Sequence, residues 1–348
     1  MNTRVSFLMV ALLVGVCCVA RCQDPPALPE PVLAVQRCFP QATIRPLPEV
    51  RYNGEIAPSE LTPSLPVYPT ISPDGRRLFF LREMDPRGWQ SYFLDLTTGE
   101  VSIAKMPDQQ LVALGGMMPL PYIEEGIWDP IAPSYLYASF PETNTYENGS
   151  TYSIWRINVE TLVGQQILPP GTNRLYNITP DGRYLLFYRP DEGIHQPYLY
   201  SLETHTWKPQ PENMMLAMRT YAPNGELVAG FTNTQGQPTV LAIRDVMTDR
   251  LAQVFNQNQV LFSVPPGARP DLIGTPTWLP DSAGLLVNIV SLGDNSFNTI
   301  WHVGINGEAR PIASGVAVVA NSQNGRHWLL QHGQQFYVIA VGDESPEE

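Results

Sequence analysis

The chain of 348 residues contains 43% hydrophobic and 16% charged residues, a composition that can bury a sizeable core and that excludes a disordered protein. Its 33 acidic residues outnumber its 21 basic ones, and the net charge of −12 argues against nucleic acid or anionic lipid as a partner. The 35 prolines argue against long helices, and we find no amphipathic helical pattern.

Residues 1–22 have the pattern of an export signal. Arg4 supplies a positive charge, Val5–Val16 is an almost unbroken apolar run, and small residues allow cleavage after Ala20 or Cys22. The run is shorter than the ~20 apolar residues that span a membrane. The sequence therefore predicts an exported protein, periplasmic or extracellular, without a transmembrane span. Loss of the two leader arginines changes the net charge from −12 to −14.

All four cysteines lie near the N-terminus, at positions 17, 18, 22 and 38. Cleavage after Ala20 would allow a Cys22–Cys38 disulfide, whereas cleavage after Cys22 would leave Cys38 alone. A lipid anchor on Cys17 is a further alternative, disfavoured by the bulky Val16 that precedes it.

Next to the leader, residues 23–66 form a Pro-rich segment that we expect to be extended and irregular. Within it, residues 41–47 could form a strand. The last repeat of the chain, described below, has no residues left for its own outer strand. We therefore expect the N-terminal strand to pair with the last repeat and close a ring, which removes a free sheet edge.

A tight turn between two apolar strands recurs along the rest of the chain, residues 67–348. Proline fixes the first corner, Asp or Asn bonds to the backbone ahead of it, and glycine adopts a positive φ. The turn residues of the three best copies are Pro73, Asp74 and Gly75; Pro180, Asp181 and Gly182; and Pro223, Asn224 and Gly225.

Three weaker copies complete a series with anchors at positions 73, 133, 180, 223, 280 and 323. The spacing between anchors is typical of four-stranded propeller blades. A second apolar strand follows each anchor, and outer strands are visible at 101–104 and 164–168. Runs such as Leu78–Leu81 are apolar on both faces, which indicates sheets covered on both sides. The sequence predicts an all-β protein, a β-propeller of six four-stranded antiparallel blades, with seven blades as the alternative.

Loops between blades are the first place to look for a binding surface, and long insertions fall at 106–126, 141–152 and 256–275. The first of these contains a mixture of flexible apolar and acidic side chains that could contact a protein partner. The alternative is that its apolar residues only pack the loop onto its own blade. The candidate partner-binding residues are Met117, Met118, Tyr122, Glu124, Glu125, Trp128 and Asp129.

Catalytic and metal-binding motifs are absent from the sequence, and we predict no catalytic residue, cofactor or metal ligand. The five histidines are scattered over several repeats. Acidic pairs such as Glu124 with Asp129 are explained by solvated surface charge. The glycosylation sequons at Asn148 and Asn177 are interpreted as chance matches.

The repeated Ser/Thr-Pro-Asp-Gly-Arg turn, with Leu-Asp-Leu-Thr-Thr-Gly-Glu at residues 94–100, resembles the WD40-like (PD40) repeat of TolB-type propellers. Prolyl-oligopeptidase-like peptidases contain similar repeats. The chain has neither the α/β domain of the first group nor the hydrolase domain of the second. The resemblance implies a propeller that binds or scaffolds proteins in the cell envelope or extracellular space. The alternatives are a lyase or hydrolase acting on carbohydrate or peptide at the propeller axis, and a sensor for a small ligand.

Overall fold

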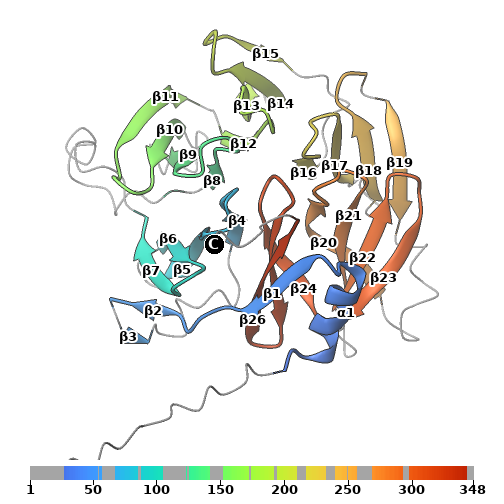
Figure 1. Cartoon of the computed structure of the whole chain (residues 1–348). Helices are drawn as coiled ribbons and strands as arrows, with labels where there is room; N and C mark the ends of the chain where they lie inside the picture. The colour runs from blue at the N-terminus through green and yellow to red at the C-terminus, as the bar shows by residue number, and fades with distance from the viewer. Residues whose placement is uncertain are drawn as a thin grey trace, which may run out of the picture.

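Six β-sheets arranged around a common axis make up this computed structural model (Figure 1). The structure describes residues 27–53, 55–56, 67–84, 88–104, 123, 125–141, 152–171, 174–191, 194–209, 217–232, 240–248, 250–256, 269–292 and 298–342. The prediction of an all-β propeller with six four-stranded antiparallel blades is confirmed, and the leader and its cysteines lie outside the described residues.

The blades follow one another in chain order, and each runs from an innermost strand to an outermost strand. Blades 1 to 3 consist of β4 (Val67–Ile71), β5 (Arg77–Met84), β6 (Gly88–Asp95) and β7 (Glu100–Ile103); β8 (Glu125–Trp128), β9 (Tyr135–Pro141), β10 (Tyr152–Asn158) and β11 (Gly164–Gly171); and β12 (Arg174–Ile178), β13 (Tyr184–Asp191), β14 (Ile194–Ser201) and β15 (Trp207–Pro209). Blades 4 and 5 consist of β16 (Ala217–Tyr221), β17 (Leu227–Thr232), β18 (Val240–Asp245) and β19 (Leu251–Asn256); and β20 (Arg269–Trp278), β21 (Gly284–Leu292), β22 (Asn298–Gly304) and β23 (Ala309–Ser314).

Blade 6 combines strands from both ends of the described chain. It contains β24 (Ala317–Asn321), β25 (His327–His332) and β26 (Gln335–Val341), and its outermost strand is β1 (Ala42–Pro46). The β1 strand runs antiparallel to β26, with Ala42 opposite Val341 and Pro46 opposite Tyr337. Thus the strand lies within the range 41–47 in which the sequence indicated one.

The N-terminal segment also contains elements that sequence reasoning missed. A helix, α1 (Glu30–Cys38), lies where an irregular segment was expected, and the interpretation that no amphipathic helix is present was wrong. Pro31 is in the first turn, where its missing N–H breaks no helical hydrogen bond. One face of the helix buries Val32 and Val35 against blades 5 and 6. A proline-rich composition therefore did not exclude a short helix.

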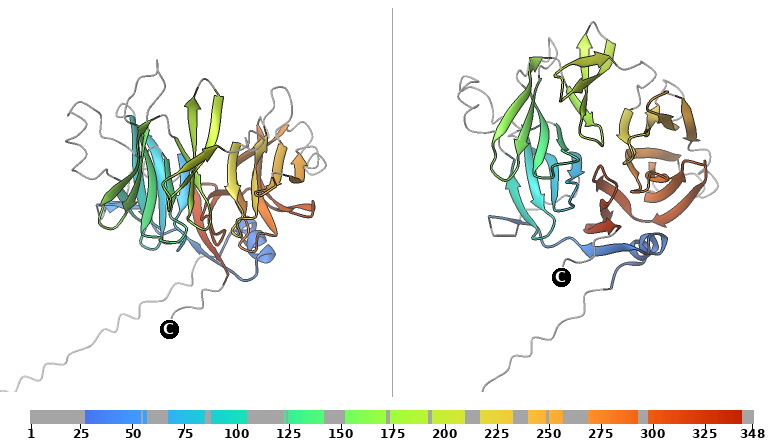
Figure 2. Two further views of the ribbon diagram at one scale, coloured as in Figure 1. Left: turned by 90° about the horizontal axis from the view of Figure 1, so that it is seen from above. Right: turned by 45° about the horizontal axis from the view of Figure 1, so that its top comes forward.

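After β1, the chain continues onto blade 1. The short strand β2 (Arg51–Tyr52) pairs in parallel with β7 and is followed by β3 (Glu55–Ile56). Two backbone hydrogen bonds tie this path down, from Leu47 N to Phe336 O at 2.8 Å and from Arg51 N to Gly99 O at 2.8 Å. Residues 30–52, which we call the N-terminal strap, thus contact blades 5, 6 and 1, as the blue ribbon in Figures 1 and 2 shows.

Successive residues of the second strand in a blade pack against different neighbours. In β5, Phe80 joins a cluster with Leu329 of blade 6, whereas Phe79 joins a cluster with Leu136 of blade 2. Both phenylalanines are fully buried. Uniformly apolar strands therefore follow from the packing of each sheet between two other sheets.

The repeated turns join the first and second strands of each blade, and their register corrects one sequence assignment. Ser72 N donates to Arg77 O at 2.8 Å, and the corresponding bond in blade 2 runs from Asp129 N to Tyr135 O at 2.9 Å. Pro130, not Pro133, therefore corresponds to Pro73. The blade 2 turn is one residue longer than the others, which hid this relationship in the sequence.

The glycine of the turn is required for two separable reasons. Gly75 and Gly225 have φ of +71° and +74°. A Cβ on Gly75 would overlap the ring of His327 in blade 6, whereas a Cβ on Gly225 would meet no atom within 4 Å. The first glycine satisfies both backbone geometry and contact between blades, and the second satisfies backbone geometry alone.

We expect Gly225→Ala to lower the free energy of unfolding by about 1–2 kcal/mol through backbone strain. Gly75→Ala should cost a further ~1–3 kcal/mol because its methyl group displaces His327. Urea unfolding of both variants measures the difference. Equal losses would show that the contact between Gly75 and His327 is not close in solution.

Candidate functional site

The tight turns of all blades lie at one end of the ring, which we call the turn face. It comprises the turns between the first and second strands and those between the third and fourth strands. Side chains make these turns rigid: Asp74 Oδ1 accepts from Ser72 Oγ at 2.5 Å and from Arg76 N at 3.1 Å. The same pattern recurs at Asp181, and at Asn324 in blade 6.

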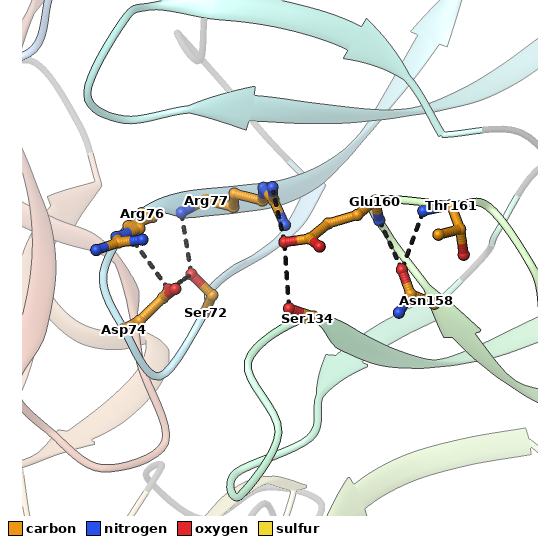
Figure 3. A network of polar contacts seen from close by, with 8 residues as sticks. All are labelled: Ser72, Asp74, Arg76, Arg77, Ser134, Asn158, Glu160 and Thr161. Atoms are coloured by element: carbon orange, nitrogen blue, oxygen red, sulfur yellow. Dashed lines mark hydrogen bonds and ion pairs between the residues drawn. The ribbon is translucent and has the colours of Figure 1, made fainter.

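Polar contacts also join neighbouring turns, as Figure 3 shows for blades 1 and 2. Glu160 Oε1 lies 3.5 Å from Arg77 Nη2 and accepts from Ser134 Oγ at 3.2 Å. Asn158 Oδ1 holds the same turn by accepting from the backbone N of Glu160 and Thr161, each at 3.0 Å. The turn face is therefore a connected polar framework, although each exposed pair contributes little by itself.

A hydrogen bond crosses the ring axis at the turn face. Gln323 Nε2, from blade 6, donates to Asn177 Oδ1 of blade 3 at 3.0 Å. These blades are opposite each other in a ring of six, so the two side chains together span the axis. Gln323 stands at the position of proline in the other copies. Asn177 is buried and also accepts from Ile178 N, which makes it a structural residue and a poor glycosylation acceptor.

Blade 2 contains a nearly buried ion pair close to the turn face. Arg156 donates to Asp129 Oδ2 from Nε at 3.1 Å and from Nη2 at 2.7 Å, and its guanidinium lies 3.9 Å from the centroid of the Tyr135 ring. Asp129 Oδ1 also accepts two backbone N–H groups of its turn. Burial, together with the nearby Asp129 carboxylate, raises the pKa of Tyr137 to about 12. This tyrosine stays protonated at neutral pH.

Of the candidate partner-binding residues, three are described. Glu125 accepts from Arg174 of blade 3 at 2.6 Å, and Trp128 is fully buried with its Nε1 bonded to Thr70 O of blade 1 at 3.0 Å. Asp129 holds the turn described above. These three side chains join blades or stabilise a turn. The remaining candidates fall outside the described residues: Met117, Met118, Tyr122 and Glu124.

Titratable groups are dispersed across the described residues. His302 lies in blade 5, and His327 and His332 lie at opposite ends of β25 in blade 6. Within the described part of the chain, no three His, Cys, Asp or Glu side chains are grouped closely enough to hold a metal ion. In the same part, no helix has the length and apolar composition needed to cross a membrane.

Exposed apolar side chains are a feature of the turn face that the sequence did not reveal. Ile131, in the first turn of blade 2, is 68% exposed, and Met247, in a turn of blade 4, is 90% exposed. Ile305 and Leu162 occupy comparable turns in blades 5 and 2. Turns are usually polar, and the sequence alone did not show which apolar residues lie in turns. The structure places these four in turns, where their side chains are exposed.

Comparison with known proteins supports the fold. No protein-family model and no curated protein matches the chain. Among solved structures, the Agrobacterium tumefaciens protein assigned as TolB is similar with a TM-score of 0.50 at 12% identity, over 81% of this chain and 92% of that one. Identity this low shows a common fold alone. The described architecture is a six-bladed β-propeller whose fold is similar to that of the Agrobacterium protein, and membership of the TolB-type PD40 repeat family stays a prediction.

Two further structures are similar over much of the chain. TolB from Acinetobacter baumannii gives a TM-score of 0.47 at 14% identity, over 80% of this chain and 54% of that one. An oligogalacturonate lyase from Vibrio parahaemolyticus gives 0.46 at 14% identity, over 79% and 77%. This chain therefore spans about half the length of the Acinetobacter protein, whose whole-protein activity does not transfer.

We expect Gln323→Ala to lower the free energy of unfolding by about 0.5–1.5 kcal/mol, because the bond across the axis is lost. Chemical unfolding measures this loss, and Gln331→Ala in the same blade, with its exposed side-chain bond, is the control. An effect no larger than the control would mean that water replaces the axial bond without cost.

His302 should make the protein sensitive to mild acid. Burial, and then the positive Arg310, lower the pKa of His302 below its ordinary value of 6.5. The unfolded chain therefore binds a proton that the folded chain does not, and stability falls as pH drops below about 6.5. Thermal unfolding from pH 7.5 to 5 should show a smaller decline for His302→Phe than for the parent protein. Parallel curves would contradict this assignment.

Proposed function

We propose that this chain is an exported, non-catalytic propeller that binds or scaffolds a protein partner through its turn face. The observation that carries the proposal is the presence of exposed apolar side chains, above all Ile131 and Met247, on turns that hydrogen bonds hold rigid. Because these bonds already fix the backbone of the turns, binding here costs little backbone entropy. The exposed apolar side chains are therefore well suited to be centres of a protein interface.

The hydrogen bond across the axis is further evidence that the turn face is a binding surface and not the entrance to an axial site. Gln323 and Asn177 occupy the axis where a ligand would enter from the turn face. The charged groups around them include both signs, as in Asp74 and Arg76. A surface that combines charged groups of both signs with exposed apolar side chains is compatible with a protein interface.

The insertion at 106–126 remains a second predicted contact. It connects β7 to β8, so its ends leave the blades opposite the turn face. A partner held at the turn face and one held by this insertion would approach from different ends of the ring. Variants can therefore separate the two contacts.

The experiment is proximity cross-linking of the exported full chain in its native host. Ile131→Lys and Met247→Lys should each lower recovery of a specific partner by at least about tenfold, as expected for anchor residues. Pro170→Lys, on the exposed outer strand β11 at the end away from the turn face, is the control. Met117→Ser with Met118→Ser tests the insertion. Failure to recover a partner would contradict the proposal. Recovery of the partner by both turn variants at the level of the parent protein would also contradict it.

Export is tested separately by the mass of the protein recovered outside the cytoplasm. We expect the N-terminus of the exported chain to begin at residue 21 or 23. An intact leader, or retention of the whole chain in the cytoplasm, would contradict this part of the proposal.

A further inference from the structure

The contact between blades 3 and 4 lacks a feature that the other blades share. In each blade, one residue of the second strand pairs with one residue of the third strand near the middle of the sheet. Both side chains of this pair lie on the face that packs against the preceding blade. Five of these pairs contain an aromatic residue: Phe80–Tyr92, Ala138–Trp155, Phe187–Tyr198, Val287–Trp301 and Leu330–Tyr337. In blade 4 the pair is Gly230–Ala242, the smallest combination available.

The buried apolar clusters follow the same division. Among the described residues, a cluster joins each other pair of neighbouring blades, and none joins blades 3 and 4. On this side, Tyr221, Val228 and the partly buried Val246 form a small cluster within blade 4. The innermost strands β12 and β16 also do not approach each other as closely as β8 and β12 or β16 and β20 do. Figures 1 and 2 show this wider separation of the two ribbons.

Buried residues nevertheless line this boundary, which we call the 3–4 seam. Leu185 and Leu186 are adjacent in β13 and both are fully buried. Leu185 belongs to the cluster shared with blade 2. Strand alternation directs Leu186 to the other face, toward blade 4. The seam is thus shut in this conformation, and its opening would expose Leu186 while Leu185 stays covered.

Additional described contacts tie the blades together on the other side of the ring. The N-terminal strap contacts blades 5, 6 and 1 in succession, and Phe39 at its helix end packs against Trp328 with ring centroids 5.0 Å apart. Asn324 Nδ2 of blade 6 donates to Pro73 O of blade 1 at 2.8 Å. These additional contacts lie across the ring from the boundary between blades 3 and 4.

We propose that the ring opens at the 3–4 seam, with blades 3 and 4 separating while the strap holds blades 5, 6 and 1 together. At the described positions the side chains of this contact are smaller, and smaller apolar side chains contribute less dispersion and hydrophobic free energy. Local opening is expected where such contacts are fewest. The seam gives the propeller a side entrance that does not use either end of its axis.

The test uses variants of the full chain that each carry one introduced cysteine. They are labelled under native conditions, and labelling of the introduced cysteine is quantified by peptide mass spectrometry. We expect Leu186→Cys to react at least about tenfold faster with iodoacetamide than Leu185→Cys. Leu329→Cys, at the corresponding position of blade 6 and fully buried against blade 1, should be as slow as Leu185→Cys.

A second pair avoids loss of a large leucine side chain. Val228 and Ala229 are adjacent and buried in β17, and they face blades 3 and 5 respectively. Val228→Cys should react at least about tenfold faster than Ala229→Cys. Fast reaction at both positions of a pair would mean that the blade unfolds as a whole. Slow reaction at both would mean that the seam does not open, and either result would overturn the proposal.

Discussion

Every blade of this protein has two apolar faces, and the closed ring covers both of them with the neighbouring blades. Phe79 and Phe80 express the constraint within two consecutive residues, since one is buried against blade 2 and the other against blade 6. A sheet of this kind needs neighbours on both sides. A closed ring of repeated sheets meets this need because it leaves no terminal sheet with an exposed apolar face. Indole hydrogen bonds reinforce it, because Trp128 and Trp278 each donate to a carbonyl of the preceding blade at 3.0 Å.

The need to bury the apolar faces of the blades also explains where the blades depart from a regular repeat. The N-terminal strap supplies the outer strand of blade 6 and extra surface over blades 5 and 1. Blade 4 meets its preceding neighbour with Gly230 and Ala242 and is supported instead by a large cluster on its blade 5 side. Gln323 replaces proline in one turn, and its longer side chain reaches the opposite blade. The blades therefore share one fold but differ in how each contacts its neighbours.

The repeat made most of the ring predictable from sequence. Turns such as Pro73-Asp74-Gly75 combine backbone chemistry with a fixed relation to the strands around them, so both the blade number and the order of strands could be read. The α1 helix could not, because it is nine residues long and its stability comes from packing Val32 and Val35 on distant blades. The blade 2 register was displaced because its turn is one residue longer.

The candidate site was less predictable than the fold. Trp128 and Asp129 looked like parts of a binding loop because composition cannot distinguish a residue before a tight turn from one on an exposed insertion. Gln323 could have been noticed as the one anchor without proline, and the partner of its side chain depends on ring closure. The exposure of Ile131 depends on which turn it occupies.

The most direct test of mutual covering is equilibrium denaturant unfolding of Phe79→Ala and Phe80→Ala. Because each side chain fills a different contact between blades, we expect both variants to lose about 3–5 kcal/mol of unfolding free energy. A loss below about 1 kcal/mol at either position would show that one face of this strand is open to solvent, which contradicts the closed ring.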